Sequence, residues 1–341
     1  MTHPAMERRA EVWAALLAWY RAEGRHDLPW RQTRDPYAIL VSEVMLQQTQ
    51  VERVQPRYLA FLARFPTLRV LADASRAEVI QAWAGLGYNL RAVRLHEIAQ
   101  QAVASPDGAL PGTLDGLLRL KGIGRYTAGA VACFAFGLQV ATVDTNIRRV
   151  LWRVFRGIEP ATWPGDQQSS RILLELAEWA LPPGEAYDWQ QALMELGARI
   201  CVARRPRCEQ CPLATYCAAL AETGEHTLFP SGEALERLRH ERAIVAGTLA
   251  EEPASYTVAG SPARRKAERF EESSRYFRGR VVATLRELGP GEMLALRELG
   301  PRVKPAFMAD DEPWLRGLVS RLARDGLVSL SADGERVSLP R

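Results

Sequence analysis

The segment Leu120-Lys-Gly-Ile-Gly-Arg-Tyr-Thr-Ala128 joins two stretches of helical periodicity. Gly122 and Gly124 carry no Cβ, so they allow a tight turn with positive φ and a close approach of the backbone. The helix that follows would offer unpaired N–H groups and a positive dipole end, which favour an anion. Neither the spacing of a P-loop nor the strand that precedes a dinucleotide-binding motif is present. The segment predicts a helix–hairpin–helix that grips a nucleic-acid phosphate; a plain helix–turn–helix corner also explains two glycines.

Length and composition indicate a globular protein with more than one domain. The chain has 341 residues, of which 47% are hydrophobic and 25% charged, which excludes disorder along the whole chain and suggests two or three domains. There is no apolar run of about 18 residues, so we expect no membrane-spanning helix. The N-terminal sequence MTHPAMERRAEVW has no secretory signal, which predicts a cytoplasmic protein. A net charge of +4 permits a nucleic-acid partner without requiring one.

The chain up to about Ala218 is predicted to be mainly helical. Apolar residues recur there at intervals of three and four, and strand-like alternation is scarce. Short segments with Pro, Gly or Asp separate the periodic stretches, which indicates many short helices rather than one long bundle. The expected helices include Val12–Tyr20, Ala38–Leu46, Tyr58–Phe65, Val79–Ala84, Val93–Ala102, Leu114–Leu120, Ala128–Phe136 and Ile147–Phe155.

The character of the chain changes after Cys217. Apolar alternation in residues 226–262 predicts a linker with a weak hairpin. Residues 263–280 then carry seven Arg or Lys side chains against three Glu, a basic patch that the net charge hides. The patch, together with the domain that follows, is a candidate for nonspecific DNA binding. A stabilising or protein-binding role remains the alternative.

The C-terminal residues have the layout of a winged helix. We expect a helix over Tyr276–Leu288, and a second one that starts between residues 311 and 313 and ends at Arg324, before Gly326. The stretches Leu327–Leu330 and Arg336–Leu339 flank an Asp-Gly turn and predict a hairpin. Two helices followed by a hairpin suggest a small α/β domain over residues 263–341.

Four of the five cysteines lie within seventeen residues, with the spacing Cys201-x6-Cys208-x2-Cys211-x5-Cys217. Four soft ligands this close can converge on one metal centre. Disulfides are the weaker account in a cytoplasmic chain. Only one Cys-x2-Cys pair is present, which favours an iron–sulfur cluster over zinc, although zinc and unligated thiols stay open on spacing alone. Cys133 falls in an apolar helical run and is expected to be a small buried side chain.

The loop between Cys201 and Cys208 is rich in arginine. Arg204 and Arg205 lie inside it, together with Arg207. A metal-pinned loop that presents guanidinium groups suits phosphate contact, while a solvated surface loop is the alternative.

Two carboxylates stand out for acid chemistry. Glu43 lies in the otherwise apolar stretch 38–46, where burial would raise its pKa and make it a general acid; an exposed Glu on a polar face is the alternative. Asp144 follows apolar residues and precedes a helix, so an N-terminal cap is its simplest interpretation. One raised and one ionised carboxyl group together would suit cleavage of a glycosidic bond through a cationic transition state.

Separate motifs in a fixed order resemble the MutY adenine glycosylases of the endonuclease III, or helix–hairpin–helix, superfamily. The resemblance covers roughly residues 8–220 and implies a [4Fe–4S] cluster on Cys201, Cys208, Cys211 and Cys217. Its motifs are Leu28-Pro-Trp-Arg31, Asp35-Pro-Tyr37, Val41-Ser-Glu-Val-Met-Leu-Gln-Gln-Thr-Gln-Val51, Gly85-Leu-Gly-Tyr88, the segment 120–128, Val143-Asp-Thr-Asn146 and the cysteine spacing.

The resemblance implies catalytic roles for four residues. Glu43 corresponds to the acid that protonates N7 of a flipped adenine. Asp144 corresponds to the carboxylate that stabilises the oxocarbenium ion or bonds to C1′, and Asn146 sits beside it. Tyr126 stands where bifunctional relatives carry a Schiff-base lysine, which implies a monofunctional glycosylase.

The resemblance also implies binding residues. Arg31 and Gln191 resemble residues of the adenine pocket, and Gln48 and Tyr88 resemble the wedge that enters the duplex where the base leaves. The remaining DNA-binding candidates come from the hairpin and the cysteine loop: Gly122, Ile123, Gly124, Arg125, Thr127, Arg204 and Arg205.

The chain departs from the family pattern in three places. The Phe-Ser-His loop with which relatives read 8-oxoguanine is absent, and residues 263–341 resemble a winged helix rather than a Nudix-related domain. Asn89 and Thr145 replace the Tyr and Gly that are commonest at their positions.

The expected architecture is mainly α, a two-lobed helix–hairpin–helix glycosylase fold. Its predicted parts are an N-terminal helix that packs on the cluster domain (1–27), a six-helix domain (28–140), an iron–sulfur domain (141–220), a linker (221–262) and a winged-helix-like domain (263–341).

The expected function is removal of adenine mispaired with 8-oxoguanine or guanine in double-stranded DNA, by a nucleoid-associated monomer without membrane contact. A thymine glycosylase for T·G mispairs is the nearest alternative, because relatives of that kind also carry Tyr at position 126. An iron–sulfur winged-helix regulator is a remote one. Tyr126 disfavours a bifunctional lyase.

Overall fold

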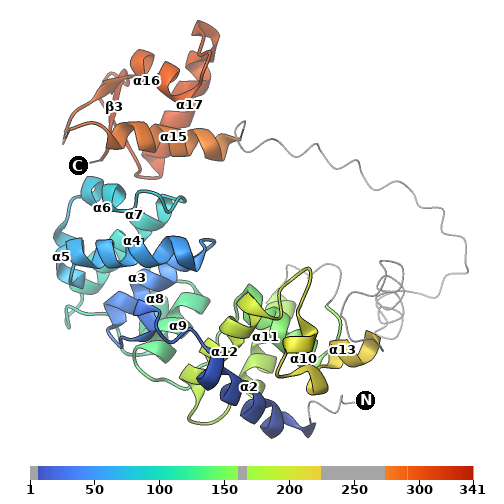
Figure 1. The fold of residues 1–341 in the computed structure, drawn as a ribbon. Helices are drawn as coiled ribbons and strands as arrows, with labels where there is room; N and C mark the ends of the chain where they lie inside the picture. Colours follow the sequence, from blue (N-terminus) through green and yellow to red (C-terminus); the bar gives the residue numbers. More distant parts are fainter. Residues whose placement is uncertain (1–6, 160–166, 224–272, 290, 341) are drawn as a thin grey trace, which may run out of the picture. The chain divides into compact units, whose positions relative to one another are not determined.

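The computed structural model describes residues 7–159, 167–223, 273–289 and 291–340. Contacts divide the chain into two units. Unit 1 comprises Met1–Arg34 and Gly124–Ser255, and unit 2 comprises Asp35–Ile123 and Tyr256–Arg341 (Figure 1). The hairpin predicted at residues 120–128 is therefore the point where the chain passes from unit 2 back to unit 1. The predicted hairpin in residues 226–262 and the first part of the basic patch lie outside the described residues.

Unit 1 is helical throughout its described part. Its elements are α2 (Arg9–Glu23), η1 (Pro29–Arg31), α9 (Arg125–Phe134), α10 (Thr145–Phe155), α11 (Gln167–Ala180), α12 (Ala186–Arg199), η2 (Cys208–Gln210), η3 (Ala214–Tyr216) and α13 (Ala218–Thr223). Three of these helices, α2, α10 and α12, share one buried core, which contains Leu16, Tyr20, Val150, Trp189 and Leu196. Burying a large apolar side chain contributes about 1.5–3 kcal/mol, so the N-terminal helix is a firmly packed part of this unit.

The first part of unit 2 is also helical. It contains α3 (Pro36–Leu46), α4 (Val51–Arg64), α5 (Leu68–Asp73), α6 (Arg76–Ala82), α7 (Leu90–Val103) and α8 (Leu114–Arg119). Residues next to each helix determine where several of these helices begin. The Asp35 carboxylate accepts a hydrogen bond from the Tyr37 N–H, with Pro36 at the first helical position. Ser75 and Glu78 form a capping box at α6.

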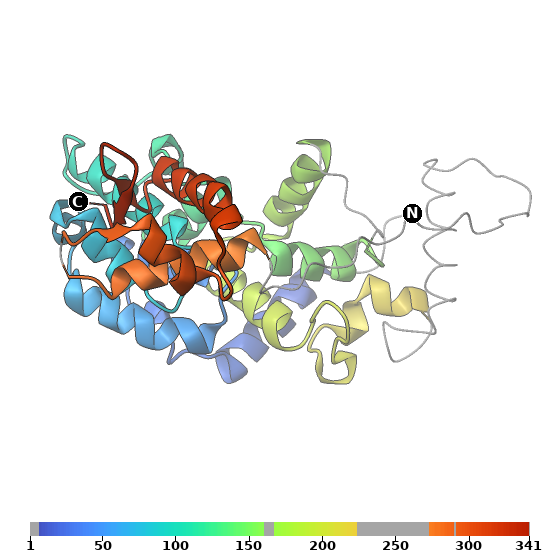
Figure 2. The same ribbon diagram turned by 90° about the horizontal axis from the view of Figure 1, so that it is seen from above.

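The C-terminal part of unit 2 groups α15 (Ser274–Arg286), α16 (Leu296–Val303), η5 (Ala309–Asp311) and α17 (Glu312–Arg324) with a small sheet (Figure 1, Figure 2). The strands β1 (Leu294–Ala295), β2 (Ser329–Leu330) and β3 (Arg336–Ser338) pair antiparallel in the order β1-β3-β2. Leu294 and Leu330 both face Val337 across the ladder. The predicted terminal hairpin is confirmed, and Gly334 takes φ 74° in its turn. The described C-terminal residues thus combine three α-helices with a three-stranded antiparallel sheet.

The C-terminal part packs against α6 and α7. Ile80 and Val93 are almost fully buried in the same core as Leu285 and Leu322. The Arg286 guanidinium donates to the Ile80 carbonyl at 2.8 Å and to the Asn89 side-chain oxygen at 2.9 Å. Burial lowers the pKa of Arg286 to about 10. The unusual Asn89 therefore has a partner in the C-terminal part, because its amide oxygen accepts a hydrogen bond from Arg286.

The sequence missed five helices in the described residues. They are α5, α11, α12, α13 and α16. Helices α5 and α13 are short, with six residues each. The periodicity of α12 is hidden because Gln190, Gln191 and Glu195 are polar yet buried. The ten predicted helices all exist, although α4 begins seven residues before the predicted Tyr58.

The division into units differs from the predicted domain of residues 28–140. Residues 28–34 and 124–140 group with unit 1 instead. Arg34 shows the physical reason. It donates to the Phe134 carbonyl at 3.2 Å, and its guanidinium lies 3.6 Å from the centre of the Tyr187 ring, and both partners belong to unit 1.

Candidate active site

Asp144 is the N-cap of α10. Its carboxylate accepts a hydrogen bond from the Ile147 N–H at 2.6 Å and one from the Asn146 amide at 3.4 Å. Burial raises the pKa of Asp144, and these bonds together with the Arg149 charge offset only part of that rise. We expected the ionised member of the carboxylate pair here. The raised pKa differs from that expectation because burial removes the water that would solvate the charge.

The side-chain oxygen of Asn146 accepts a hydrogen bond from a buried arginine, Arg149. Arg149 donates to the Asn146 side-chain oxygen at 2.8 Å, to the Gly197 carbonyl at 2.7 Å and to the Cys201 carbonyl at 2.7 Å. A Cβ on Gly197 would lie 2.7 Å from the Asn146 Cβ, so α10 and α12 can approach this closely only at a glycine. A chain of hydrogen bonds thus joins the Asp144 carboxylate to the first cysteine of the cluster motif. The sequence analysis missed Arg149.

The structure brings Arg31 and Gln191 together. The Arg31 Nε donates to the Gln191 Oε1 at 2.9 Å, and Arg31 forms an ion pair at 2.9 Å with Glu195, whose side chain is fully buried. Arg25 and Arg199 donate to the same carboxylate. Burial alone would raise the pKa of Glu195, but the hydrogen bond from Arg25 and the charges of Arg31 and Arg25 outweigh it and lower the pKa.

Sequence reasoning also missed Glu195, the centre of this arginine cluster. Glu195 lies four residues after Gln191 on the same helix, so the two side chains share a face. That spacing was the signal that could have found it.

Tyr126 lies on α9, where its hydroxyl donates to the Met194 sulfur at 3.3 Å. The Tyr126 side chain carries no amine that could form a Schiff base. Glu43 lies on α3 with 6% of its surface exposed, so the predicted burial is observed and the exposed alternative is wrong. Glu43 belongs to unit 2, whereas Asp144, Asn146 and Tyr126 belong to unit 1.

Gln48 and Tyr88 share an unusual backbone conformation. They have φ 55° and 46°, in a region that residues with a side chain rarely adopt. Both line one cavity of about 690 Å³ in unit 2, so the structure brings the two predicted wedge residues to one site. The Arg275 guanidinium lies 3.8 Å from the centre of the Tyr88 ring.

The turn between α8 and α9 takes positive φ at one of its two glycines. Gly122 has φ 104°, while Gly124 has φ −88° and ψ 168° and is the N-cap of α9. Ile123 is buried beneath the turn. Gln101 also fixes the turn, since its side chain accepts from the Lys121 N–H at 2.8 Å.

The remaining hairpin residues have different surroundings. Arg125 is exposed in the first turn of α9, while Thr127 is buried. Thr127 therefore supports the helix, and Arg125 is the side chain available to an anion. Arg204 and Arg205 are exposed in the cysteine loop. Arg153 holds that loop by donating to the Val202 and Ala203 carbonyls, both at 3.0 Å.

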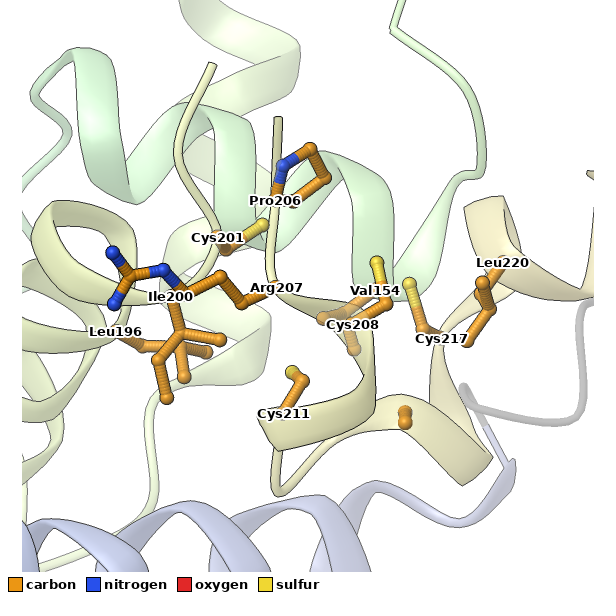
Figure 3. Close-up of a pocket in the computed structure, with 11 residues that line it drawn as sticks. Val154, Leu196, Ile200, Cys201, Pro206, Arg207, Cys208, Cys211, Cys217 and Leu220 are labelled. Carbon is orange, nitrogen blue, oxygen red and sulfur yellow. The ribbon is translucent and has the colours of Figure 1, made fainter. Parts of the chain in front are cut away.

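The four clustered cysteines line one pocket (Figure 3). Four thiolate sulfurs around one pocket are the donor set that a [4Fe–4S] cluster takes. Burial raises the pKa of the Cys211 and Cys217 thiols to about 12, so ligation must displace their protons. Cys133 is buried on α9, as predicted.

Comparisons with known proteins agree with this geometry. Residues 41–178 match the family described as HhH-GPD superfamily base excision DNA repair protein, and residues 201–217 match the iron–sulfur binding domain of endonuclease III. The fold and the cysteine centre thus define a helix–hairpin–helix DNA glycosylase with a [4Fe–4S] cluster.

An adenine DNA glycosylase of Mycolicibacterium smegmatis is 38% identical over 321 residues, which cover 94% of this chain and 93% of that protein. The adenine DNA glycosylase of Homo sapiens is 45% identical over 65% of this chain and 42% of its own length. The chain belongs to the family of MutY-type adenine DNA glycosylases.

The structure of a thermostable thymine-DNA glycosylase is also similar. It is 32% identical, with a TM-score of 0.58, and the match covers 64% of this chain and 99% of that one. Because the chain belongs to a family of DNA glycosylases, its binding partner is DNA. Among the described residues, no helix is both long and apolar enough to cross a membrane.

Proposed function

We propose that the protein, as a monomer, hydrolyses the N-glycosidic bond of adenine mispaired with 8-oxoguanine or guanine in double-stranded DNA. The observation that carries this proposal is the fixed Asp144 carboxylate, held by the Ile147 N–H and Asn146. The 38% identity to an adenine DNA glycosylase over 94% of the chain supports adenine as the base.

The proposed reaction begins with extrusion of the base. An adenine inside a duplex is unreachable, and flipping it out costs a few kcal/mol. Gln48 and Tyr88 would fill the space that the base leaves. The hairpin N–H groups at Gly122, Ile123 and Gly124, together with Arg125, would hold a phosphate of the distorted strand.

Glu43 and Asp144 would then act on the glycosidic bond. Purine departure needs protonation, which Glu43 would supply to N7 of the base. As the bond breaks, the sugar becomes an oxocarbenium ion, and the Asp144 carboxylate would stabilise that cation at close range. The developing positive charge favours the ionised form of Asp144 and so opposes the rise in its pKa caused by burial. Water then adds at C1′ to complete hydrolysis. Arg31 and Gln191 would bind the flipped adenine.

Strand cleavage is not part of the proposed reaction. A lyase requires an amine at the reacting centre to form a Schiff base, and Tyr126 offers only a hydroxyl. The [4Fe–4S] cluster, when bound, cross-links the segment from Cys201 to Cys217. We propose that Arg204 and Arg205 contact DNA phosphates from the loop that Cys201 and Cys208 fix at both ends.

A thymine glycosylase for T·G mispairs is the second candidate. The similar thymine-DNA glycosylase structure favours it. Thymine has no N7, however, so the proposed role of Glu43 would be lost. An iron–sulfur regulator without activity is disfavoured, because such a protein would not need the buried Glu43 and would use Asp144 only as a helix cap.

One assay distinguishes these candidates. The protein is incubated with duplexes that carry a single A·8-oxoguanine, A·G, T·G or thymine-glycol site, and abasic sites are scored before and after alkali. We expect adenine release, with strand breaks only after alkali. Release from T·G alone would establish the thymine candidate, and release from no duplex would refute the proposal. Glu43→Gln should bind DNA normally without releasing adenine, and an active variant would reject its acid role.

A further inference from the structure

A single buried arginine closes the C-terminal end of α3. Arg91, on α7, has 6% of its surface exposed. Its Nη1 donates to the carbonyls of Val44 and Met45, both at 2.9 Å, and to that of Gln47. The last carbonyls of a helix have no partner within the helix. A cation at this end also complements the helix dipole.

The other arm of Arg91 holds the second wedge loop. Nη2 donates to the Leu86 and Gly87 carbonyls, both at 3.3 Å, and to the Thr49 hydroxyl at 3.0 Å. One guanidinium therefore connects the loop of residues 46–50, which carries Gln48, to the loop of residues 85–88, which carries Tyr88.

Both loops contain a conformation that needs support. Gln48 and Tyr88 are two of the three non-glycine residues with positive φ among the described residues. Such a backbone persists only where the surroundings hold it. Arg91 bonds to the residue before Gln48 and to the residue after it, and also to the residue before Tyr88.

The positions of the hydrogen-bond acceptors around Arg91 suit a guanidinium group and not the ammonium group of a lysine. The six acceptors of Arg91 are five carbonyl oxygens and one hydroxyl. A planar fork with fixed N–H directions can serve oxygens from two loops at once, whereas a lysine ammonium is a single point with three donors. An arginine paired with a carboxylate could be explained by charge alone, but Arg91 donates to neutral oxygens in both loops.

We propose that Arg91 is a positioning residue for base extrusion, which sets the two wedge loops as one unit and ties them to the helix that carries Glu43. This inference deepens the proposed function and rests on it. Arg91 is buried beneath the loops, so it acts through Gln48 and Tyr88 rather than by touching DNA.

The test compares Arg91→Lys with wild type and with Arg69→Lys, which makes the same change at an exposed arginine of α5. Extrusion is followed by the fluorescence of 2-aminopurine at the position of the target adenine. Binding is measured with a duplex that holds a tetrahydrofuran abasic analogue, which needs no extrusion. Single-turnover release and the thermal midpoint complete the set.

Arg91→Lys should abolish the rise in 2-aminopurine fluorescence and slow adenine release at least tenfold. Its affinity for the duplex with the abasic analogue should change less than threefold, and its thermal midpoint should stay near that of wild type. Arg69→Lys should match wild type in every measurement. Thr49→Val, which removes one of the six bonds, should change extrusion in the same direction by a smaller factor. This variant keeps the proposal testable should Arg91→Lys fail to fold.

A normal fluorescence rise in a folded Arg91→Lys protein would overturn the inference. An equal loss of extrusion and of abasic-site affinity would also overturn it, since that result indicates a general structural role. Wild type that releases no adenine would refute the proposed function alone, because the dependence of extrusion on Arg91 can still be scored with 2-aminopurine placed next to the thymine of a T·G duplex.

Discussion

Replacing Glu195 by Gln should destabilise unit 1 strongly. The Glu195 side chain is fully buried and lies within 2.7 Å of Arg25 and 2.9 Å of Arg31. Glutamine has the same shape but no charge, so it leaves the nearly buried Arg31 guanidinium without its counter-ion. Removing one partner of a buried pair costs about 3–5 kcal/mol, because the remaining charge stays uncompensated.

The predicted loss of about 3–5 kcal/mol is a large part of an ordinary stability of about 5–15 kcal/mol. Arg31 would keep its bond to Gln191, which limits the loss to the lower part of that range. Adenine release should fall as well, because the Arg31–Gln191 pair would no longer be fixed on its inner side.

Urea unfolding followed by circular dichroism checks the magnitude, and its pH dependence checks the cause. The pKa of Glu195 is lowered in the folded protein. Its contribution is therefore fully present above the unfolded pKa of about 4.3 and is lost as the pH falls through the folded value. The difference between wild type and Glu195→Gln should shrink over that acidic window and stay constant at higher pH.

Glu185→Gln is the matched control. Glu185 also pairs with an arginine at 2.9 Å, but both side chains are about half exposed, and such pairs contribute less than about 1 kcal/mol. Equal effects of the two substitutions, or a Glu195→Gln loss below about 1 kcal/mol, would refute the reasoning that burial makes this ion pair important.

Three further outcomes are expected. Gly197→Ala should slow single-turnover adenine release more than Gly317→Ala, because the new Cβ at position 197 would displace Asn146 whereas the one at position 317 makes only an ordinary contact with the Arg321 side chain; equal rates would contradict this. Cys211→Ser should lose the broad absorbance near 400 nm of the cluster, and stoichiometric zinc without that absorbance in wild type would refute iron. If the basic patch binds phosphates, replacing Arg264, Arg265, Lys266 and Arg269 by glutamine should weaken the salt dependence of DNA binding. The slope of log affinity against log salt concentration should become shallower by up to about 0.9 per lost contact. An unchanged slope would exclude these four residues from DNA binding.

Local signals explain what could be predicted from the sequence. Helical periodicity predicted the helices at 38–46 and 79–84, and the caps at Asp35 and at Ser75 with Glu78, which need only neighbouring residues, extend them toward their N-termini. The Asp-Gly turn of the terminal hairpin is equally local. Motif order led to Arg31 and Gln191, which the structure joins by a hydrogen bond of 2.9 Å.

Features that depend on tertiary contacts escaped prediction. Glu195 keeps its charge in a buried position because Arg25 and Arg31 reach it from a segment far away in the sequence, and Gly197 is required because Asn146 approaches from another helix. The raised pKa of Asp144 likewise comes from burial. The position of Asn89 was noticed, but its partner Arg286 lies nearly two hundred residues later.

The order of the chain within unit 1 has a consequence for synthesis on the ribosome. Helix α2 packs with α10 and α12, yet residues 35–123 of unit 2 are made between them. That stretch is contiguous and its helices contact their neighbours, so it can fold as soon as it emerges. The apolar side chains of α2, such as Leu16 and Tyr20, therefore stay exposed to solvent until α12 has left the exit tunnel. We expect nascent chains that end before residue 199 to be the species most in need of chaperones.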